Sequence, residues 1–174
     1  MDKYGKLIGD HTLQFVRLLP GPIERVWEYL TDGEKRALWF AGGPMDTKAG
    51  GKVEYQFNHD RLSLEEEVYP EKYENLKDGM TSMADVITYD APTLLVIGWE
   101  GGEVTFKLEE QGDQVKLTLT HSNLKTDRDA RIGTFAGWHT HLDILVDRLS
   151  GKDPKAFWKA HSAMEEEYVN MIDS

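Results

Sequence analysis

The chain has 174 residues, of which 31 are acidic and 20 are basic, and its formal charge is −11. That charge repels phosphate backbones and anionic membranes, which argues against nucleic acid as a partner. The lack of cysteine excludes disulfides, thiolate nucleophiles and thiolate-bound metals, and it suits a compartment that keeps thiols reduced. Residues 1–10 lack the apolar core of a signal peptide and no later run is long enough to span a bilayer, so we expect a cytoplasmic domain with no membrane insertion.

Apolar residues with a period of two, separated by turn residues, predict a sheet of about seven strands. Val53, Tyr55 and Phe57 alternate with polar residues, which indicates a half-buried strand. After residue 84 such segments follow one another at short intervals, as in an antiparallel meander. Residues 69–83 are charged and irregular, as in an insertion or mobile flap, and receive no assignment. The expected strands are residues 11–19, 53–57, 61–68, 84–89, 94–100, 103–110 and 114–121, with short helices at residues 22–30 and 34–41.

A long helix over residues 128–149 is the clearest element in the sequence. Thr126 or Asp127 can cap its start, and Gly151 ends it. No other predicted element is long enough to close over the sheet, and a sheet gripped by one helix usually encloses a cavity. The helix carries a single apolar stripe with steps of three and four: Phe135, Trp138, Leu142, Leu145 and Leu149.

A final amphipathic helix is expected over residues 154–171, with Glu165, Glu166 and Glu167 at its solvated edge. Its apolar side must be covered, either by the same domain or by the same helix of a second copy. We expect docking within the chain, because the glutamate run would place like charges opposite each other in a symmetric pair. The apolar side consists of Phe157, His161, Met164 and Tyr168.

The polar residues give little support for catalysis or for metal binding. His139 and His141 are two residues apart on a helix, so their rings flank the apolar stripe on opposite sides and cannot share a metal ion. No other group has chelating spacing, and we expect neither metal nor cofactor. His121 faces inward by strand parity and could bind a ligand, act as an acid or base, or be an ordinary core-edge histidine. Glu65 or Glu67 would point into the sheet interior if residues 61–68 form a strand.

Aromatic side chains converge, by strand parity or helical phase, on the concave side of the expected sheet. Each ring could simply fill the core. Together with the closing helix they define the predicted ligand-binding set, which comprises Trp39, Phe40, Tyr55, Phe57, Trp99, Phe106, His121, Phe135, Trp138, Leu142 and Leu145.

Several short motifs, in order, resemble one known family. They are Pro22-x-x-Arg25-Val26-Trp27, Leu38-Trp39-Phe40, Gly50-Gly51, the strand at residues 115–122, and Gly137-Trp138 with the leucines that follow to Gly151. This pattern resembles the family related to the activator of the ninety-kilodalton heat-shock chaperone ATPase, within the START-like (SRPBCC, birch-pollen-allergen-like) superfamily. The resemblance implies an α+β helix-grip fold around a deep pocket. It covers about residues 11–151 of a single domain at residues 1–174, and residues 152–174 form a helical extension.

Three functions remain open at this point. The first is binding of a small, largely apolar or amphipathic molecule between the sheet and the long helix. The second is a co-chaperone role, in which the acidic surface contacts a chaperone or another protein. The third is a cyclase-like or hydrolase-like enzyme that uses His121 and Tyr55, although no catalytic set is identified and activity is the weaker expectation. The oligomeric state is open between a monomer and a homodimer.

Overall fold

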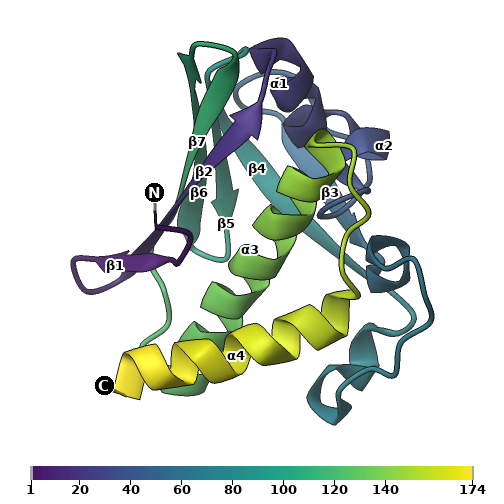
Figure 1. Ribbon diagram of the computed structural model, residues 1–174. Helices are drawn as coiled ribbons and strands as arrows, with labels where there is room; N and C mark the ends of the chain where they lie inside the picture. The colour runs from purple at the N-terminus through teal and green to yellow at the C-terminus, as the bar shows by residue number, and fades with distance from the viewer. Residues whose placement is uncertain (1, 174) are drawn as a thin grey trace.

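The computed structural model describes residues 2–173, so the two terminal residues of the predicted domain 1–174 lie outside the described residues. One antiparallel sheet with the order β1-β2-β7-β6-β5-β4-β3 curves around a long helix (Figure 1). This is the helix-grip architecture that the resemblance implies. The strands are β1 (Lys6–Ile8), β2 (Thr12–Pro20), β3 (Lys52–Phe57), β4 (Met80–Asp90), β5 (Leu94–Trp99), β6 (Gly102–Gln111) and β7 (Gln114–His121).

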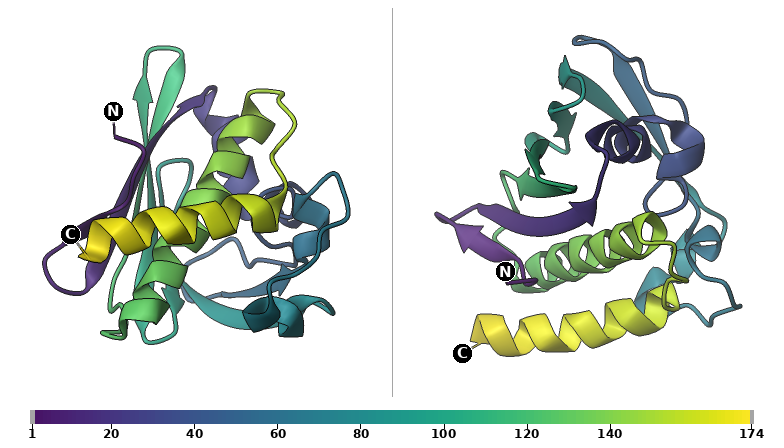
Figure 2. Two further views of the ribbon diagram at one scale, coloured as in Figure 1. Left: turned by 60° about the horizontal axis from the view of Figure 1, so that its bottom comes forward. Right: turned by 45° about the horizontal axis from the view of Figure 1, so that its top comes forward.

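The helices form two further layers beside the sheet. The long helix α3 lies between the sheet and α4, as the views in Figure 2 show. Among residues 2–173, no helix is both long enough and apolar enough to cross a lipid bilayer. The helices are α1 (Ile23–Thr31), α2 (Gly33–Arg36), α3 (Arg128–Leu149) and α4 (Phe157–Asp173), and two 3₁₀ segments, η1 (His59–Leu62) and η2 (Glu71–Leu76), stand between β3 and β4.

The bounds of α3 agree with the signals in the sequence. The side chain of Asp127 accepts a hydrogen bond from the backbone N–H of Ala130 at 2.9 Å, which caps the first turn. Gly151 has a φ of +71°, the left-handed conformation that ends many helices and that glycine adopts without strain. The apolar stripe is buried against the sheet, and Leu142 and Leu145 are fully buried. The stripe therefore positions α3 over the concave face.

The strand expected at residues 61–68 does not exist, and β1 completes the set of seven instead. The side chain of Asn58 accepts a hydrogen bond from the Asp60 N–H and starts the 3₁₀ segment η1. Beyond η1 the side chains of Leu64 and Val68 are exposed. The adjacent β3 edge is not free for this segment, because β3 pairs with β4 on one side and is bridged by Gly42 and Met45 on the other. The expectation that Glu65 or Glu67 points into the sheet interior is wrong for the same reason.

The unassigned segment at residues 69–83 contains both η2 and the beginning of β4. This strand starts at Met80, before the expected residue 84, because Phe57 and Met80 already form a pair in the ladder with β3. The side chains of Met80 and Met83 are exposed, so this part of β4 lacks the alternating burial that marks a strand in a sequence.

Helix α4 docks on α3 of the same chain, as expected. Phe157, Trp158, His161 and Tyr168 are buried in the contact. The hydroxyl of Tyr168 accepts a hydrogen bond from the Gly5 N–H at 2.8 Å and lies 2.7 Å from His139 Nδ1. The helix therefore joins the N-terminal segment to the domain.

The predicted placement of Glu165 at the solvated edge of α4 is wrong. Its side chain is only 13% exposed, and its carboxylate lies between Lys72 of η2 and His161 of α4. Segment η2 covers this part of the helix, and the sequence pattern of α4 alone contains no sign of that contact.

Candidate functional site

The predicted ligand-binding set gathers between the sheet and α3, and its rings contact one another. The ring of Phe40 is central: it stacks on Trp138 with centroids 5.1 Å apart and meets Tyr55 and Phe57 edge-on. Trp39, Trp99, Phe106 and His121 belong to the same network, whereas Phe135 faces Phe15 and Tyr168. We call this set of residues between the sheet and α3 the aromatic grip. Its side chains fill much of the space between the two. Ligand contact at these residues stays a prediction.

His121 and Tyr55 do not have the acidity that proton transfer near pH 7 requires. The Nδ1 of His121 accepts a hydrogen bond from the Trp138 indole N–H at 2.9 Å, and burial lowers the pKa of His121 to about 4. Burial raises the pKa of Tyr55 to about 12, although the nearby Arg36 guanidinium opposes the shift. General acids and bases work best with a pKa near the operating pH. The pair is therefore better suited to hold structure than to catalyse a reaction.

A hollow of about 350 Å³ lies on the flank of α3, outside the aromatic grip. We call it the histidine hollow, because it brings together His59 of η1, His141 of α3 and His161 of α4. The His59 and His141 rings have centroids 6.2 Å apart, and both lie 5.0 Å from the ring of Phe157. The remaining lining residues are Tyr73, Leu76, Asp129, Ala130, Gly133, Thr134, Gly137 and Trp158.

The floor of the histidine hollow is a run of small side chains on α3. Gly133 and Gly137 lie one turn apart inside this helix, where each glycine costs roughly 0.5–1 kcal/mol relative to alanine. A Cβ at Gly133 would lie 3.6 Å from the Tyr73 hydroxyl, and one at Gly137 would lie 4.0 Å from His161 Nε2. Both are ordinary contact distances. Packing therefore does not require glycine at either position, and the effect of the two glycines is to keep the floor open.

Two imidazoles of the hollow, those of His59 and His141, are neutral near pH 7. Burial and the adjacent His161 lower the pKa of His59 to about 4, and burial and the adjacent His59 lower that of His141 to about 3. His141 Nδ1 lies 2.8 Å from the Trp39 carbonyl oxygen, whereas His59 Nδ1 is buried without a hydrogen-bond partner among the described residues. An unpartnered buried nitrogen is costly, and the Nδ1 of His59 has almost no accessible surface, so only the rest of the ring can face the hollow.

Ionic contacts beside the hollow hold α4 against η2. Glu165 Oε2 accepts hydrogen bonds from Lys72 Nζ at 2.6 Å and from the Tyr73 hydroxyl at 3.2 Å. Its other oxygen, Oε1, is 3.3 Å from His161 Nδ1. Burial alone would raise the pKa of Glu165, but His161 and Lys72 outweigh it and lower that pKa to about 2. The carboxylate is therefore ionised at neutral pH and positions Tyr73 over the hollow.

Glu67 holds the N-terminal end of α4 by hydrogen bonds. Its carboxylate accepts hydrogen bonds from the backbone N–H groups of Trp158 at 3.0 Å and Lys159 at 3.1 Å, at the start of α4. A carboxylate in this position also interacts favourably with the positive end of the helix dipole. Glu67 therefore fixes the first turn of α4, which supplies two aromatic walls of the hollow.

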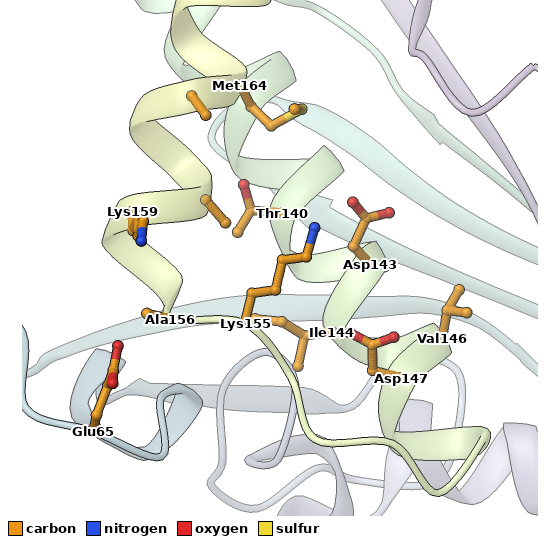
Figure 3. A pocket seen from close by; sticks show the side chains of 12 residues that line it. Glu65, Thr140, Asp143, Ile144, Val146, Asp147, Lys155, Ala156, Lys159 and Met164 are labelled. Carbon is orange, nitrogen blue, oxygen red and sulfur yellow. The ribbon is translucent and has the colours of Figure 1, made fainter.

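A second, larger groove of about 660 Å³ lies between the C-terminal half of α3 and α4 (Figure 3). Apolar side chains such as Ile144 and Met164 form part of its lining, and Asp143 and Asp147 line it on the α3 side. Lys155, from the linker before α4, extends into the groove. Asp143 is already engaged by Arg17 at 3.2 Å. The groove therefore contains its own counter-charges, unlike the histidine hollow.

The two neighbouring histidines of α3 lie on opposite flanks of the stripe, as their spacing predicts. His139 contacts Tyr4 and Tyr168, whereas His141 faces the hollow. Over residues 2–173 no cluster of three or more His, Cys, Asp or Glu side chains has the arrangement of a metal site.

Comparison with known proteins identifies the family. Residues 20–150 match the family model described as Activator of Hsp90 ATPase homolog 1-like protein. The chain belongs to this family. The match excludes α4, so the histidine hollow combines the family core with the C-terminal extension. No curated protein matches the chain.

Solved structures agree with the fold of this family member. A Bordetella parapertussis protein, studied by solution NMR, is 38% identical with a TM-score of 0.79, and the match covers 96% of this chain and 89% of that one. CalU16 from Micromonospora echinospora is 21% identical with a TM-score of 0.66, over 98% and 96% of the two chains. The Aha1 dimer from Colwellia psychrerythraea is 18% identical with a TM-score of 0.61, over 79% and 95%. The last two show the fold alone.

Sequence reasoning missed the histidine hollow of this family member. His59 lies between two expected strands and Tyr73 lies in the unassigned stretch, so neither residue had a predicted orientation. One signal was present: Gly133 and Gly137 repeat at a helical spacing of four on a helix whose opposite face is apolar. Two helix-interior glycines one turn apart indicate a stretch of that face without side chains.

Proposed function

We propose that this protein is a small-molecule-binding domain and that its ligand, a largely apolar compound, occupies the histidine hollow. The observation that carries the proposal is the hollow itself, in which the imidazoles of His59 and His141 lie beside aromatic rings and two glycines. Ligand sites are typically apolar concavities of 300–1,000 Å³ with a few polar groups that fix orientation. The hollow, at about 350 Å³, meets that description.

This proposal moves the binding site from the grip to its flank. In the grip, His121 and Trp138 satisfy each other and the aromatic rings are in mutual contact. On the flank, Gly133 and Gly137 line the hollow without side chains, and an added Cβ would already reach contact distance of Tyr73 or His161. The residues predicted in the grip then support the site by holding α3 in place, and direct ligand contact by them is the alternative.

The test is to fill the hollow without disturbing the core. An apolar fluorescent probe should bind to the wild-type protein, and Gly133→Leu should abolish binding because the new side chain occupies the floor. Glu166→Leu adds the same side chain at an exposed position of α4 and serves as the matched control, which should keep wild-type affinity. Both variants must retain the wild-type near-ultraviolet circular dichroism. Equal binding by Gly133→Leu and the wild type would place the probe elsewhere and contradict the proposal.

Protein interaction is the second candidate function, and one observation favours it. Leu64 and Val68 are 61% and 92% exposed, in a loop that also carries the exposed Glu65 and Glu66. Exposed apolar side chains among acids suit a partner surface that is apolar and basic. Leu64→Ser with Val68→Ser should then weaken binding to such a partner while leaving the probe affinity unchanged.

A further inference from the structure

The walls of the histidine hollow favour a flat ligand. Tyr73 and Trp158 stack with ring centroids 4.9 Å apart and an interplanar angle of 22°, and the ring of Trp158 lies 5.0 Å from that of His59. The same hollow is lined by Gly133 and Gly137, which have no side chain. Aromatic rings beside a surface without side chains fit an aromatic ring system better than a branched aliphatic one.

The charges around the hollow favour an uncharged ligand. Its lining contains no lysine or arginine among the described residues, and Asp129 stands on it. Glu165, an anion at neutral pH, contacts both His161 and Tyr73. A carboxylate or phosphate would therefore be placed near two anions without a cationic partner. A cation would lose its hydration in the hollow without gaining a free carboxylate. Glu165 is already paired with Lys72, and Asp129 is exposed beside Arg128.

The hydrogen-bonding state of His141 favours a ligand that donates a proton. A carbonyl oxygen can only accept, so the contact with Trp39 fixes the proton of His141 on Nδ1. Because the ring is neutral, its Nε2 keeps a lone pair and acts as an acceptor. His59 is also a neutral imidazole, so it too has one acceptor nitrogen. The hollow thus offers two imidazole acceptors in close proximity.

We infer that the ligand class of this site is an uncharged, planar aromatic compound bearing an O–H or N–H donor, such as a phenol or an N–H heteroaromatic, whose donor bonds to the His59 or His141 imidazole. This inference rests on the proposed function, because it assigns chemistry to the same hollow. Stacking against the Tyr73–Trp158 pair orients the ring, and the hydrogen bond selects the donor. Selection follows because a ligand without the donor leaves the buried imidazole acceptor unpaired.

Three matched naphthalenes test the inference on the full chain: 2-naphthol, 2-methoxynaphthalene and 2-naphthoate. We expect 2-naphthol to bind with a Kd on the order of 10⁻⁴ M, as befits a ligand of this size. The methoxy analogue keeps the ring but lacks the donor and should bind about tenfold more weakly, and the anionic naphthoate should bind most weakly. Equal affinity for the first two, or tightest binding of naphthoate, would overturn the inference.

Two further measurements test the hydrogen bond between 2-naphthol and the imidazoles directly. His59→Phe preserves ring shape and should bring the affinity for 2-naphthol toward that of the methoxy analogue, without changing the latter. In the wild-type protein, the ¹⁵N shifts of the His59 or His141 ring nitrogens should respond to 2-naphthol but not to the methoxy analogue, which tests the contact even if His59→Phe folds poorly.

The outcomes also separate this inference from the proposed function. If Gly133→Leu removes binding of both neutral probes and their affinities are equal, the hollow is the site but the ligand class is wrong. If neither neutral probe binds to the wild type, or if Gly133→Leu leaves binding intact, the proposed function itself fails.

Discussion

The aromatic grip and the histidine hollow contain similar side chains but differ in how these are packed and paired. In the grip, the polar atoms are paired: Trp138 donates to His121 and the Trp39 indole donates to the Tyr29 carbonyl at 2.7 Å. In the hollow, the rings of His59 and His141 share the lining with two glycines that have no side chain. Packed rings with satisfied polar groups contribute stability, whereas a hollow lined by rings and a few polar groups is available to a ligand. The difference separates the region that holds the fold from the region that we propose to function.

The largest expected effect comes from emptying the grip. Trp138→Ala removes a ring that is stacked on Phe40 and leaves His121 without its donor, and it should lower the free energy of unfolding by roughly 3–5 kcal/mol. Urea denaturation followed by circular dichroism measures the loss. A loss below about 1 kcal/mol would mean that the grip is loosely packed and could itself hold a ligand, which would reverse the comparison.

Acid should destabilise the protein through its buried neutral histidines. Folding lowers the pKa of His59 from about 6.5 to about 4, so the unfolded chain binds more protons between these pH values. Its contribution to stability is complete above pH 6.5 and is lost as the pH falls toward 4, by roughly 2–3 kcal/mol. His121 and His141 act in the same direction.

Comparing His59→Phe with the wild type isolates the part of this loss that comes from the hollow. The variant should lose roughly a third less stability than the wild type between pH 7 and pH 4, as measured by urea denaturation at each pH. Superimposable pH profiles would show that the His59 imidazole is not held neutral by burial.

A smaller effect is expected where Glu67 caps α4. Glu67→Ala leaves the N–H groups of Trp158 and Lys159 without their acceptor and should cost about 1 kcal/mol. Because these residues border the hollow, binding of 2-naphthol should weaken as well. Glu66→Ala, at the exposed neighbouring position, is the control and should change neither quantity. Identical results for the two variants would exclude the cap.

The smallest expected effect comes from Gly133→Ala, and it tests the difference between the grip and the hollow most directly. Gly133→Ala should stabilise the protein by roughly 0.5–1 kcal/mol, since alanine favours the helix and the new Cβ would lie at contact distance from Tyr73. The same methyl group narrows the hollow and should weaken 2-naphthol binding. Thermal unfolding should therefore show a gain in stability for this variant, and fluorescence titration should show a loss of affinity. Destabilisation by Gly133→Ala would show that glycine is needed for packing rather than for space.

Local patterns were sufficient wherever one side of an element is buried. The α3 stripe and the inward sides of β3 and β7 were predicted, because burial leaves a period of 3.6 or 2 in the sequence. The docking of α4 within the chain was predicted from the charges of its glutamate run instead. β1 was missed for the opposite reason. All three of its residues are exposed, and it is held by main-chain pairing with β2 after a turn at Gly9, so its side chains show no alternation.

The sequence by itself determined the fold class, the family and the residues that surround the interior, because these follow from periodicity and from ordered motifs along the chain. Only the tertiary structure decided that Glu67 caps α4, that Glu165 is buried against η2, and that His59, His141 and His161 share one hollow. These contacts join η1, η2, α3 and α4, which are distant along the chain. Their physical basis is the fit of one surface to another, and that fit leaves no periodic trace in either segment.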